Sequence, residues 1–117
     1  MLLIEITRGD HKSYKFLRKT KDGEIITEKP QKMYFTVKKS FYQSEFLFQK
    51  RLDEGITYTE QDYYYHFEIK PEDTDGLNFG DDYVFDIEII EQNGKKKTIA
   101  KGKIKITEEV TFAENEG

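Results

Sequence analysis

Apolar and polar residues alternate with a period of two along most of the chain, in short runs that end at turn residues. Such alternation is typical of β-strands that bury one face. In the run Lys32–Lys39, Met33, Phe35 and Val37 share one face, and Tyr, Thr and Lys residues occupy the other. No run keeps a helical period over three turns. The pattern therefore predicts an all-β domain.

The expected strands are seven such runs. They span Leu2–Thr7, Lys12–Lys19, Lys32–Lys39, Glu45–Lys50, Tyr63–Lys70, Tyr83–Glu91 and Lys95–Thr107. Pro30 excludes a central strand in the less regular stretch before Gln31, and a short helical turn is expected near 72–76. With about seven to nine strands, one open sheet could not bury both aromatic faces, so two packed sheets are implied. We predict an immunoglobulin-like antiparallel β-sandwich.

The last two runs predict a hairpin. Asn93-Gly94 tolerates positive φ at both centres of a type I′ turn, which gives a two-residue loop closed by Gln92 and Lys95. A one-residue slip from this register would bury charged side chains. The expected cross-strand pairs are Ile87 with Ala100, Phe85 with Gly102, Tyr83 with Ile104, Asp86 with Lys101, and Asp82 with Lys105.

A structural role is expected for Tyr83. The segment Pro71-Glu72-Asp73-Thr74, which leads to Tyr83-Val84-Phe85, resembles the E–F corner of immunoglobulin domains. In that corner a Tyr near the start of strand F forms a hydrogen bond with the preceding loop through its hydroxyl. The disulfide of antibody domains has no counterpart here, so the likeness concerns architecture alone.

Charge is unevenly distributed. The formal net charge is −4, and the last ten residues contain four acids and no base, which leaves 19 bases and 19 acids in the rest of the chain. We expect one domain over residues 1–109 and an acidic, flexible tail over 110–117, serving either solubility or interaction. A neutral body has no overall field to attract nucleic acid.

The 117 residues include no cysteine, which excludes thiol nucleophiles and thiolate zinc sites. Their absence also fits folding in a reducing cytoplasm. Glu5 and Arg8 end the apolar run Met1–Ile4 far short of a signal-peptide core, and nothing approaches a membrane span. We expect a protein that is made in the cytoplasm and does not bind membranes.

The sequence offers few candidates for catalytic residues. Asp10, His11 and Ser13 are the residue types of a catalytic triad, but adjacency in sequence is not triad geometry. The other histidine, His66, is expected on the outer face of a strand. We therefore expect no catalytic residue.

An acidic stretch after residue 72 matches the first positions of a calcium-binding loop but not the later ones. Asp73-Thr74-Asp75-Gly76 has the right start, but Leu77 stands where a third ligand belongs and no Glu closes the loop. Helix capping and turn formation are the simpler explanation of these residues. We expect no metal site and no cofactor.

Tyrosines and lysines dominate the expected surface. Tyr34 and Tyr64 lie on the outward phase of their runs, and Tyr58 is expected to join them. Exposed Tyr can stack on sugars or anchor a protein partner, although cross-strand packing alone would also place Tyr there. The lysines of the last run are expected to form a solubilising, edge-protecting surface.

The order of these signals resembles a known group of proteins. The resemblance is carried by Ile6-Thr7-Arg8-Gly9-Asp10, Met33-Tyr34-Phe35-Thr36-Val37-Lys38-Lys39, Pro71 to Leu77, Gly80 to Glu88, and Ile104 to Thr111. Together they resemble small, mostly uncharacterised prophage proteins of low-GC Gram-positive bacteria over nearly the whole chain. More distantly, the chain is similar to the immunoglobulin-like N-terminal domain of phage baseplate upper proteins, which continue into further domains that this sequence does not contain.

The resemblance implies a phage structural or accessory protein of the tail or baseplate type, without known catalytic residues. Its expected partners are proteins, either further copies of itself or other phage structural proteins, and its expected location after assembly is the virion. A different hypothesis is a carbohydrate- or cell-surface-binding module that uses Tyr34, Tyr58 and Tyr64.

Overall fold

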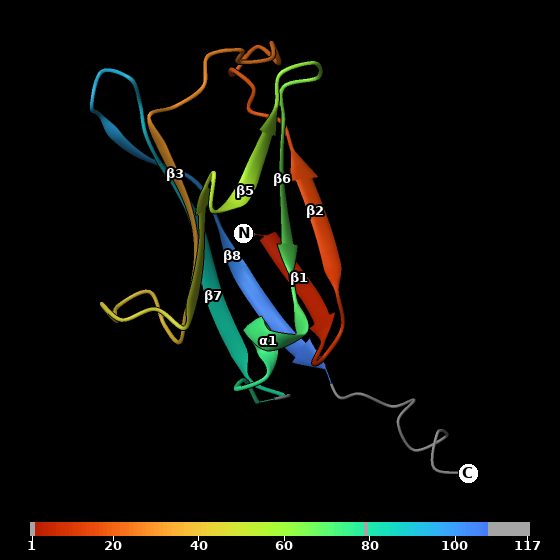
Figure 1. Ribbon diagram of the computed structural model, residues 1–117. Coiled ribbons are helices and arrows are strands. Elements are labelled where there is room, and N and C mark those ends of the chain that lie inside the picture. Colours follow the sequence, from red (N-terminus) through yellow and green to blue (C-terminus); the bar gives the residue numbers. More distant parts are fainter. Residues whose placement is uncertain (1, 79, 108–117) are drawn as a thin grey trace.

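The computed structural model describes residues 2–78 and 80–107 of the chain. Within them the fold is almost entirely β, which confirms the predicted all-β class (Figure 1). The elements are β1 (Leu2–Thr7), β2 (Lys12–Phe16), β3 (Lys32–Lys38), β4 (Phe48–Leu52), β5 (Gly55–Thr59), β6 (Tyr64–Ile69), α1 (Pro71–Thr74), β7 (Asp82–Ile90) and β8 (Lys96–Thr107).

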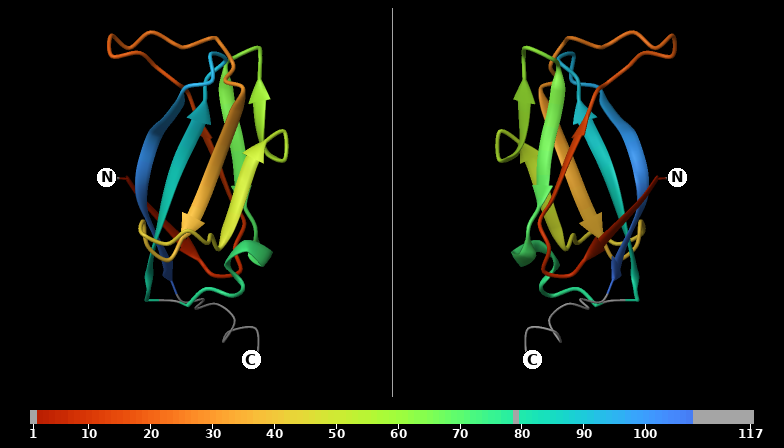
Figure 2. Two further views of the ribbon diagram at one scale, coloured as in Figure 1. Left: turned by 90° about the vertical axis from the view of Figure 1, so that its left-hand side faces the viewer. Right: turned by 90° about the vertical axis from the view of Figure 1, so that its right-hand side faces the viewer.

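The eight strands form one strongly curved sheet that nearly closes on itself (Figure 2). Their order is β1-β8-β7-β3-β4-β5-β6-β2, so the first two strands of the chain occupy opposite ends of the sheet. Five pairings are antiparallel, as predicted. Two are parallel, which the sequence did not indicate: β1 with β8, and β4 with β5 through only two residue pairs.

The interior of the curved sheet is filled by aromatic and β-branched side chains. Met33, Phe35 and Val37 of β3 are fully buried, as predicted from their alternation. The ring of Phe35 lies at the centre, 4.4 Å from the ring of Phe67 and 5.4 Å from that of Phe85, measured between centroids. One cluster thus joins β3, β6 and β7.

The β7–β8 hairpin has the predicted pairs and a different turn. All five expected pairs, from Ile87–Ala100 to Asp82–Lys105, are present. The loop, however, has three residues, because Glu91 N–H donates to the Lys95 carbonyl at 2.9 Å and Gly94 adopts a φ of 85°. The predicted Gln92–Lys95 closure is therefore wrong.

A β-bulge farther along the hairpin restores the predicted register of β7 against β8. The pairing shifts between Ile87 and Glu88, so that Glu88 faces Thr98. A bulge of this kind inserts one unpaired residue, which offsets the residue added to the loop. Because pairing with β3 also sets the phase of β7, the loss of this bulge would turn the Lys101 side chain of β8 toward the core, and burying that charge would cost more free energy than the irregular ladder.

Other strand limits also differ from the prediction. The strand β5 was not predicted, because its alternating stretch is short and mostly polar apart from buried Ile56. Phe46, expected in a strand with Phe48, precedes β4 and is 48% exposed. Tyr63 has a φ of 65° in the turn before β6, so the strand begins one residue later than expected.

The helix α1 closes one end of the curved sheet. The carboxylate of Asp73 accepts a hydrogen bond from Lys70 N–H at 2.8 Å and pairs with the Lys50 ammonium at 2.6 Å. Beyond the helix, the Tyr83 hydroxyl accepts a hydrogen bond from Asn78 N–H at 2.9 Å, which ties the loop to β7.

Gly102 lies where β1, β8 and the core approach each other closely. A Cβ at this residue would lie 2.6 Å from Cε1 of Phe85 and would also clash with the Leu2 carbonyl oxygen. Gly102→Ala is expected to lower the free energy of unfolding by about 1–3 kcal/mol, since either the ring or β1 must move.

The matched control for that substitution is Gly76→Ala. Nothing lies within 4 Å of a Cβ there and its φ is not positive, so stability should stay within about 0.5 kcal/mol of the parent. Urea unfolding of both variants measures the contrast, and equal effects would contradict the packing described around Gly102.

Candidate functional site

An apolar groove of about 430 Å³ lies where the sheet fails to close, between β1 and β8 on one side and β2 on the other. We call it the seam groove. Its lining residues are Leu2, Leu3, Ile4, Tyr14, Lys15, Phe16, Leu17, Arg18, Lys19, Ile26, Phe67, Phe85, Ile87, Lys97, Ile99 and Ala100.

The groove opens because β1 and β2 diverge from each other with increasing distance from the turn that joins them (Figure 2). Near this turn the seam is bridged, since the Lys12 ammonium donates a hydrogen bond to the Glu5 carbonyl at 2.8 Å. Farther along, Leu2 and Leu3 at the start of β1 are 58% and 59% exposed. Each of the two strands is terminal in the sheet and has one strand neighbour, so its outer edge is available for pairing.

The floor of the groove is part of the aromatic core. Tyr14 and Phe16 of β2 stack on Phe67 and Tyr65 of β6, each pair at 5.3 Å between centroids. Across the seam, Phe85 belongs to the buried cluster and Ile99 packs against it. The floor is therefore apolar and packed on the core, as in preformed binding sites.

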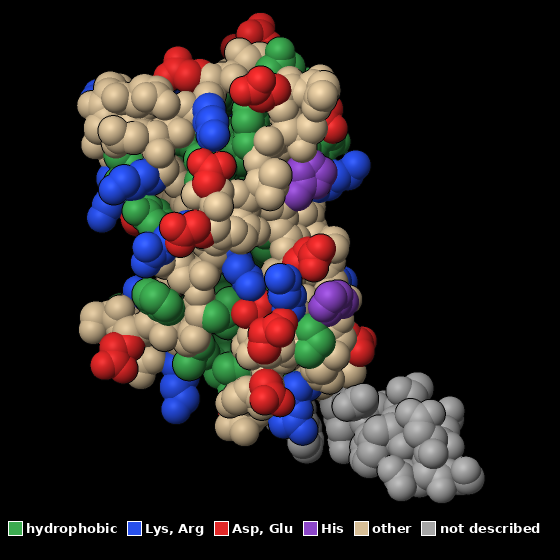
Figure 3. Space-filling model, viewed as in Figure 1, with side chains coloured by type: hydrophobic (Ala, Val, Ile, Leu, Met, Phe, Trp, Pro, Cys, Tyr) green, Lys and Arg blue, Asp and Glu red, His purple; other side chains and the backbone are tan. Residues whose placement is uncertain are grey.

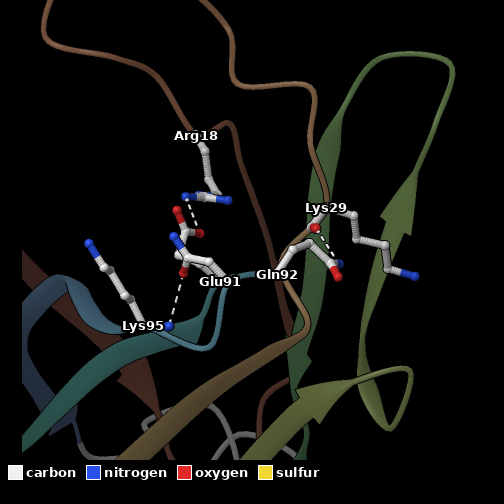
Figure 4. Close-up of polar contacts among 6 residues, drawn as sticks. Arg18, Lys29, Glu91, Gln92 and Lys95 are labelled. Atoms are coloured by element: carbon white, nitrogen blue, oxygen red, sulfur yellow. Dashed lines mark hydrogen bonds and ion pairs between the residues drawn. The ribbon is translucent and has the colours of Figure 1, made fainter.

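One end of the groove is held by a partly buried ion pair. The Arg18 guanidinium, whose side chain is 6% exposed, lies 3.1 Å from the Glu91 carboxylate at the end of the β7–β8 hairpin (Figure 4). The Gln92 amide also donates to the Lys29 carbonyl at 2.9 Å (Figure 4). Both contacts fasten the long segment after β2 to that hairpin, which fixes the width of the groove at this end.

The charged side chains that line the groove are all basic. Its lining includes Lys15, Lys19 and Lys97, all exposed, and the ion-paired Arg18. No Asp or Glu lines it within the part of the chain that the structure describes. The groove thus combines an apolar floor with a positive rim.

The tyrosines singled out from the sequence do not form one row. Tyr58 shares the inner face of β5 with Ile56, packs against the core, and lies 4.8 Å from the Tyr65 ring. Its expected outward position is therefore wrong. On β6, the ring centroid of Tyr64 lies 4.6 Å from the Lys15 ammonium. On β3, the ring centroid of Tyr34 lies 5.9 Å from the guanidinium carbon of Arg51.

The two histidines lie apart on the molecular surface (Figure 3). His66 lines a separate hollow of about 340 Å³ with Ser13, Lys50 and Glu68, among others, whereas His11 is not part of that lining. The structure therefore does not gather the residues Asp10, His11 and Ser13 around a common pocket.

The acidic stretch after β6 is engaged in structural contacts. Asp73 caps α1 and pairs with Lys50, while the Thr74 hydroxyl accepts a hydrogen bond from Gly9 N–H at 3.2 Å. Among the described residues, no group of three or more His, Cys, Asp or Glu side chains could hold a metal ion. No helix there is long and apolar enough to span a membrane.

The lysines of β8 alternate along its exposed face, as the sequence suggested, but β8 lies between β1 and β7, so their expected edge-protecting role is wrong. Lys101 and Lys105 stand opposite Asp86 and Asp82. Burial raises the pKa of Asp86, Glu88 raises it further, and Lys101 and Lys38 oppose the rise. On the face seen in Figure 3, acids and bases are interspersed, with no large area of a single sign. The expected tail over 110–117 lies outside the described residues.

No family model and no curated protein matches this chain. The seam groove therefore has to be interpreted from its own chemistry. Sequence reasoning did not find it, although a signal existed. Leu2-Leu3-Ile4 and Phe16-Leu17 place apolar side chains on both faces of a strand, which strict alternation over one core does not require.

Tyr14 provides a test of the groove floor. Its hydroxyl is buried without a hydrogen-bond partner among the described residues, and burial raises the pKa of the phenol above its usual 10.0. As the pH rises past 10, the unfolded state loses this proton first, so stability falls until the folded pKa is passed.

Tyr14→Phe should leave stability at pH 7 within about 0.5 kcal/mol of the parent and make its decline above about pH 9 shallower. Urea unfolding across the alkaline range measures both effects. Tyr42→Phe is the control, because Tyr42 is 99% exposed and should not change the slope. An unchanged slope in Tyr14→Phe would contradict the buried position of the hydroxyl.

Proposed function

We propose that this protein is a non-catalytic interaction module with an immunoglobulin-like architecture, and that the seam groove binds an extended polypeptide. The observation that carries the proposal is the groove itself, with an apolar floor, a basic rim and an unpaired strand edge on each side. Each of these features contributes a different part of the recognition.

The strand order supports the immunoglobulin-like architecture. The junction between β4 and β5 has only two residue pairs. Dividing the sheet there gives the layers β1-β8-β7-β3-β4 and β5-β6-β2, which face each other across Phe35 and Phe67. These correspond to the G-F-C-C′ and D-E-B groupings of immunoglobulin domains, with β1 beside G. The Asn78–Tyr83 hydrogen bond supports the same assignment, since it lies where this assignment would put the E–F corner.

An extended polypeptide fits the groove for a geometric reason. A strand laid along the free edge of β2 could form main-chain hydrogen bonds, as in other cases of strand addition. Alternate side chains of that strand would then point to the apolar floor between Phe16 and Ile99. Basic side chains on the rim favour a partner that carries acids beside its apolar residues.

A phage structural or accessory role, of the tail or baseplate type, is our proposal for the biological setting. It is supported by the resemblance of nearly the whole chain to prophage proteins, and by a groove suited to protein partners. The protein would then be made in the cytoplasm and join the virion on assembly. Neighbouring genes for tail or head proteins would support this setting, and neighbouring sugar-utilisation genes would count against it.

The binding proposal is tested with two synthetic nonapeptides. Both carry two apolar residues at alternate central positions; one is flanked by glutamates and the other by lysines. Amide NMR spectra of the isotope-labelled full chain should show saturable shifts along β1, β2 and the start of β8 with the acidic peptide. We expect the basic peptide to bind at least about tenfold more weakly.

Leu3→Lys should abolish these shifts, because Leu3 lines the groove. Leu47→Lys is the matched control, since Leu47 is also an exposed apolar residue but does not line the groove. The proposal fails if the shifts map elsewhere on the sheet, or if both peptides bind equally well.

A further inference from the structure

We propose that the polypeptide bound in the seam groove is the C-terminal segment of a second copy of this chain, with Val110 and Phe112 facing the apolar floor. This inference rests on the proposed function and names the partner. Residues 108–117 lie outside the described part of the chain, so the argument uses their sequence and the position of Thr107.

The segment has the chemistry that the groove requires. Val110 and Phe112 are two positions apart, so an extended backbone would present both on one face. Thr111 and Ala113 would occupy the other face, where small side chains suffice. Four acids flank this apolar pair: Glu108, Glu109, Glu114 and Glu116.

Charge complementarity singles out this segment within the chain. The other residues contain 19 bases and 19 acids, so the whole net charge of −4 resides in the last ten residues. The groove rim carries Lys15, Lys19 and Lys97 and no acid among the described residues. An acidic strand entering this rim gains favourable electrostatic energy from the lysines and meets no carboxylate among the lining residues that the structure describes.

The segment cannot carry both apolar residues to the far part of its own groove, between Phe16 and Ile99. Thr107 pairs with Thr7 at the end of the seam that the turn closes. The near end of the groove, at Ile4, pairs with Ile104 and lies close to Thr107, but Ala100 and Ile99 of its far part are seven and eight residues before Thr107, which corresponds to about 23–26 Å along the strand. Phe112 is five residues beyond Thr107 and lies at most about 17 Å away even when fully extended.

Reversing the chain direction at Thr107 would shorten that reach further. The segment of another copy is free of this limit, so the groove and the segment fit each other between molecules. Two copies that exchange segments reciprocally form a closed dimer, whereas one-way exchange forms a chain of copies.

The test is the mass of the full chain in solution, measured by sedimentation velocity over a wide concentration range. The wild-type protein should exceed its monomer mass of 13.9 kDa. Phe112→Ser, which removes the anchor, and Leu3→Lys, which blocks the groove, should each raise the dissociation constant at least about tenfold. Leu47→Lys is the control and should associate like wild type.

Mixing the two defective variants separates exchange between molecules from a folding defect. Phe112→Ser keeps an intact groove and Leu3→Lys keeps an intact segment, so the mixture should form a one-to-one complex that neither variant forms alone. The inference is overturned if the wild-type chain stays monomeric, if Phe112→Ser associates normally, or if the mixture stays monomeric.

A synthetic peptide of residues 107–117 distinguishes this inference from the broader proposal. It should bind the Phe112→Ser protein and shift the amides of β1 and β2, with affinity that falls as salt is added. If the acidic model nonapeptide binds the groove and this peptide does not, the second-copy assignment fails alone. If neither binds, the proposed function fails with it.

Discussion

Contact between aromatic rings across the curved sheet holds the rest of the structure in place. Phe35 of β3 lies 4.4 Å from Phe67 of β6, although their strands are separated in the sheet by β4 and β5. This contact requires the sheet to bend until its two halves face each other. Because offset-stacked rings bury large apolar areas in a restricted geometry, the same contact sets how far apart the halves lie.

The bending of the sheet leaves its two end strands, β1 and β2, near each other but unpaired. The eight strands bend far enough to bury Phe35, but β1 pairs with β8 and β2 pairs with β6, so the two ends do not pair with each other. The Lys12–Glu5 contact joins them near the turn, and the Arg18–Glu91 ion pair holds the far end. The seam groove is the space left between these two fixed ends, and its floor is the outer limit of the core.

Much of the fold could be predicted from local pattern, whereas local pattern gave at most apolar runs as a signal for the candidate site and not the strands that form it. The alternation of Met33, Phe35 and Val37 specifies which face of β3 is buried, whatever its neighbours are. By contrast, Leu3 and Ile99 line one groove only because β1 pairs with β8, and no residue in either strand indicates that parallel pairing. Tyr58 illustrates the same limit: its strand is too short to establish a phase, and only contact with Tyr65 shows which way it points.

The sequence by itself determined the side-chain phase of the long strands, because a period of two is a local property of an extended backbone. It also determined the register of β7 against β8 from Asp82 to Ile87, since charged residues on one face exclude the alternative. The tertiary structure decided the order of the strands, the incomplete closure, and therefore the groove. Those features depend on contacts between residues far apart in the chain, such as Phe35 with Phe67, and local alternation carries no information about which distant strands become neighbours.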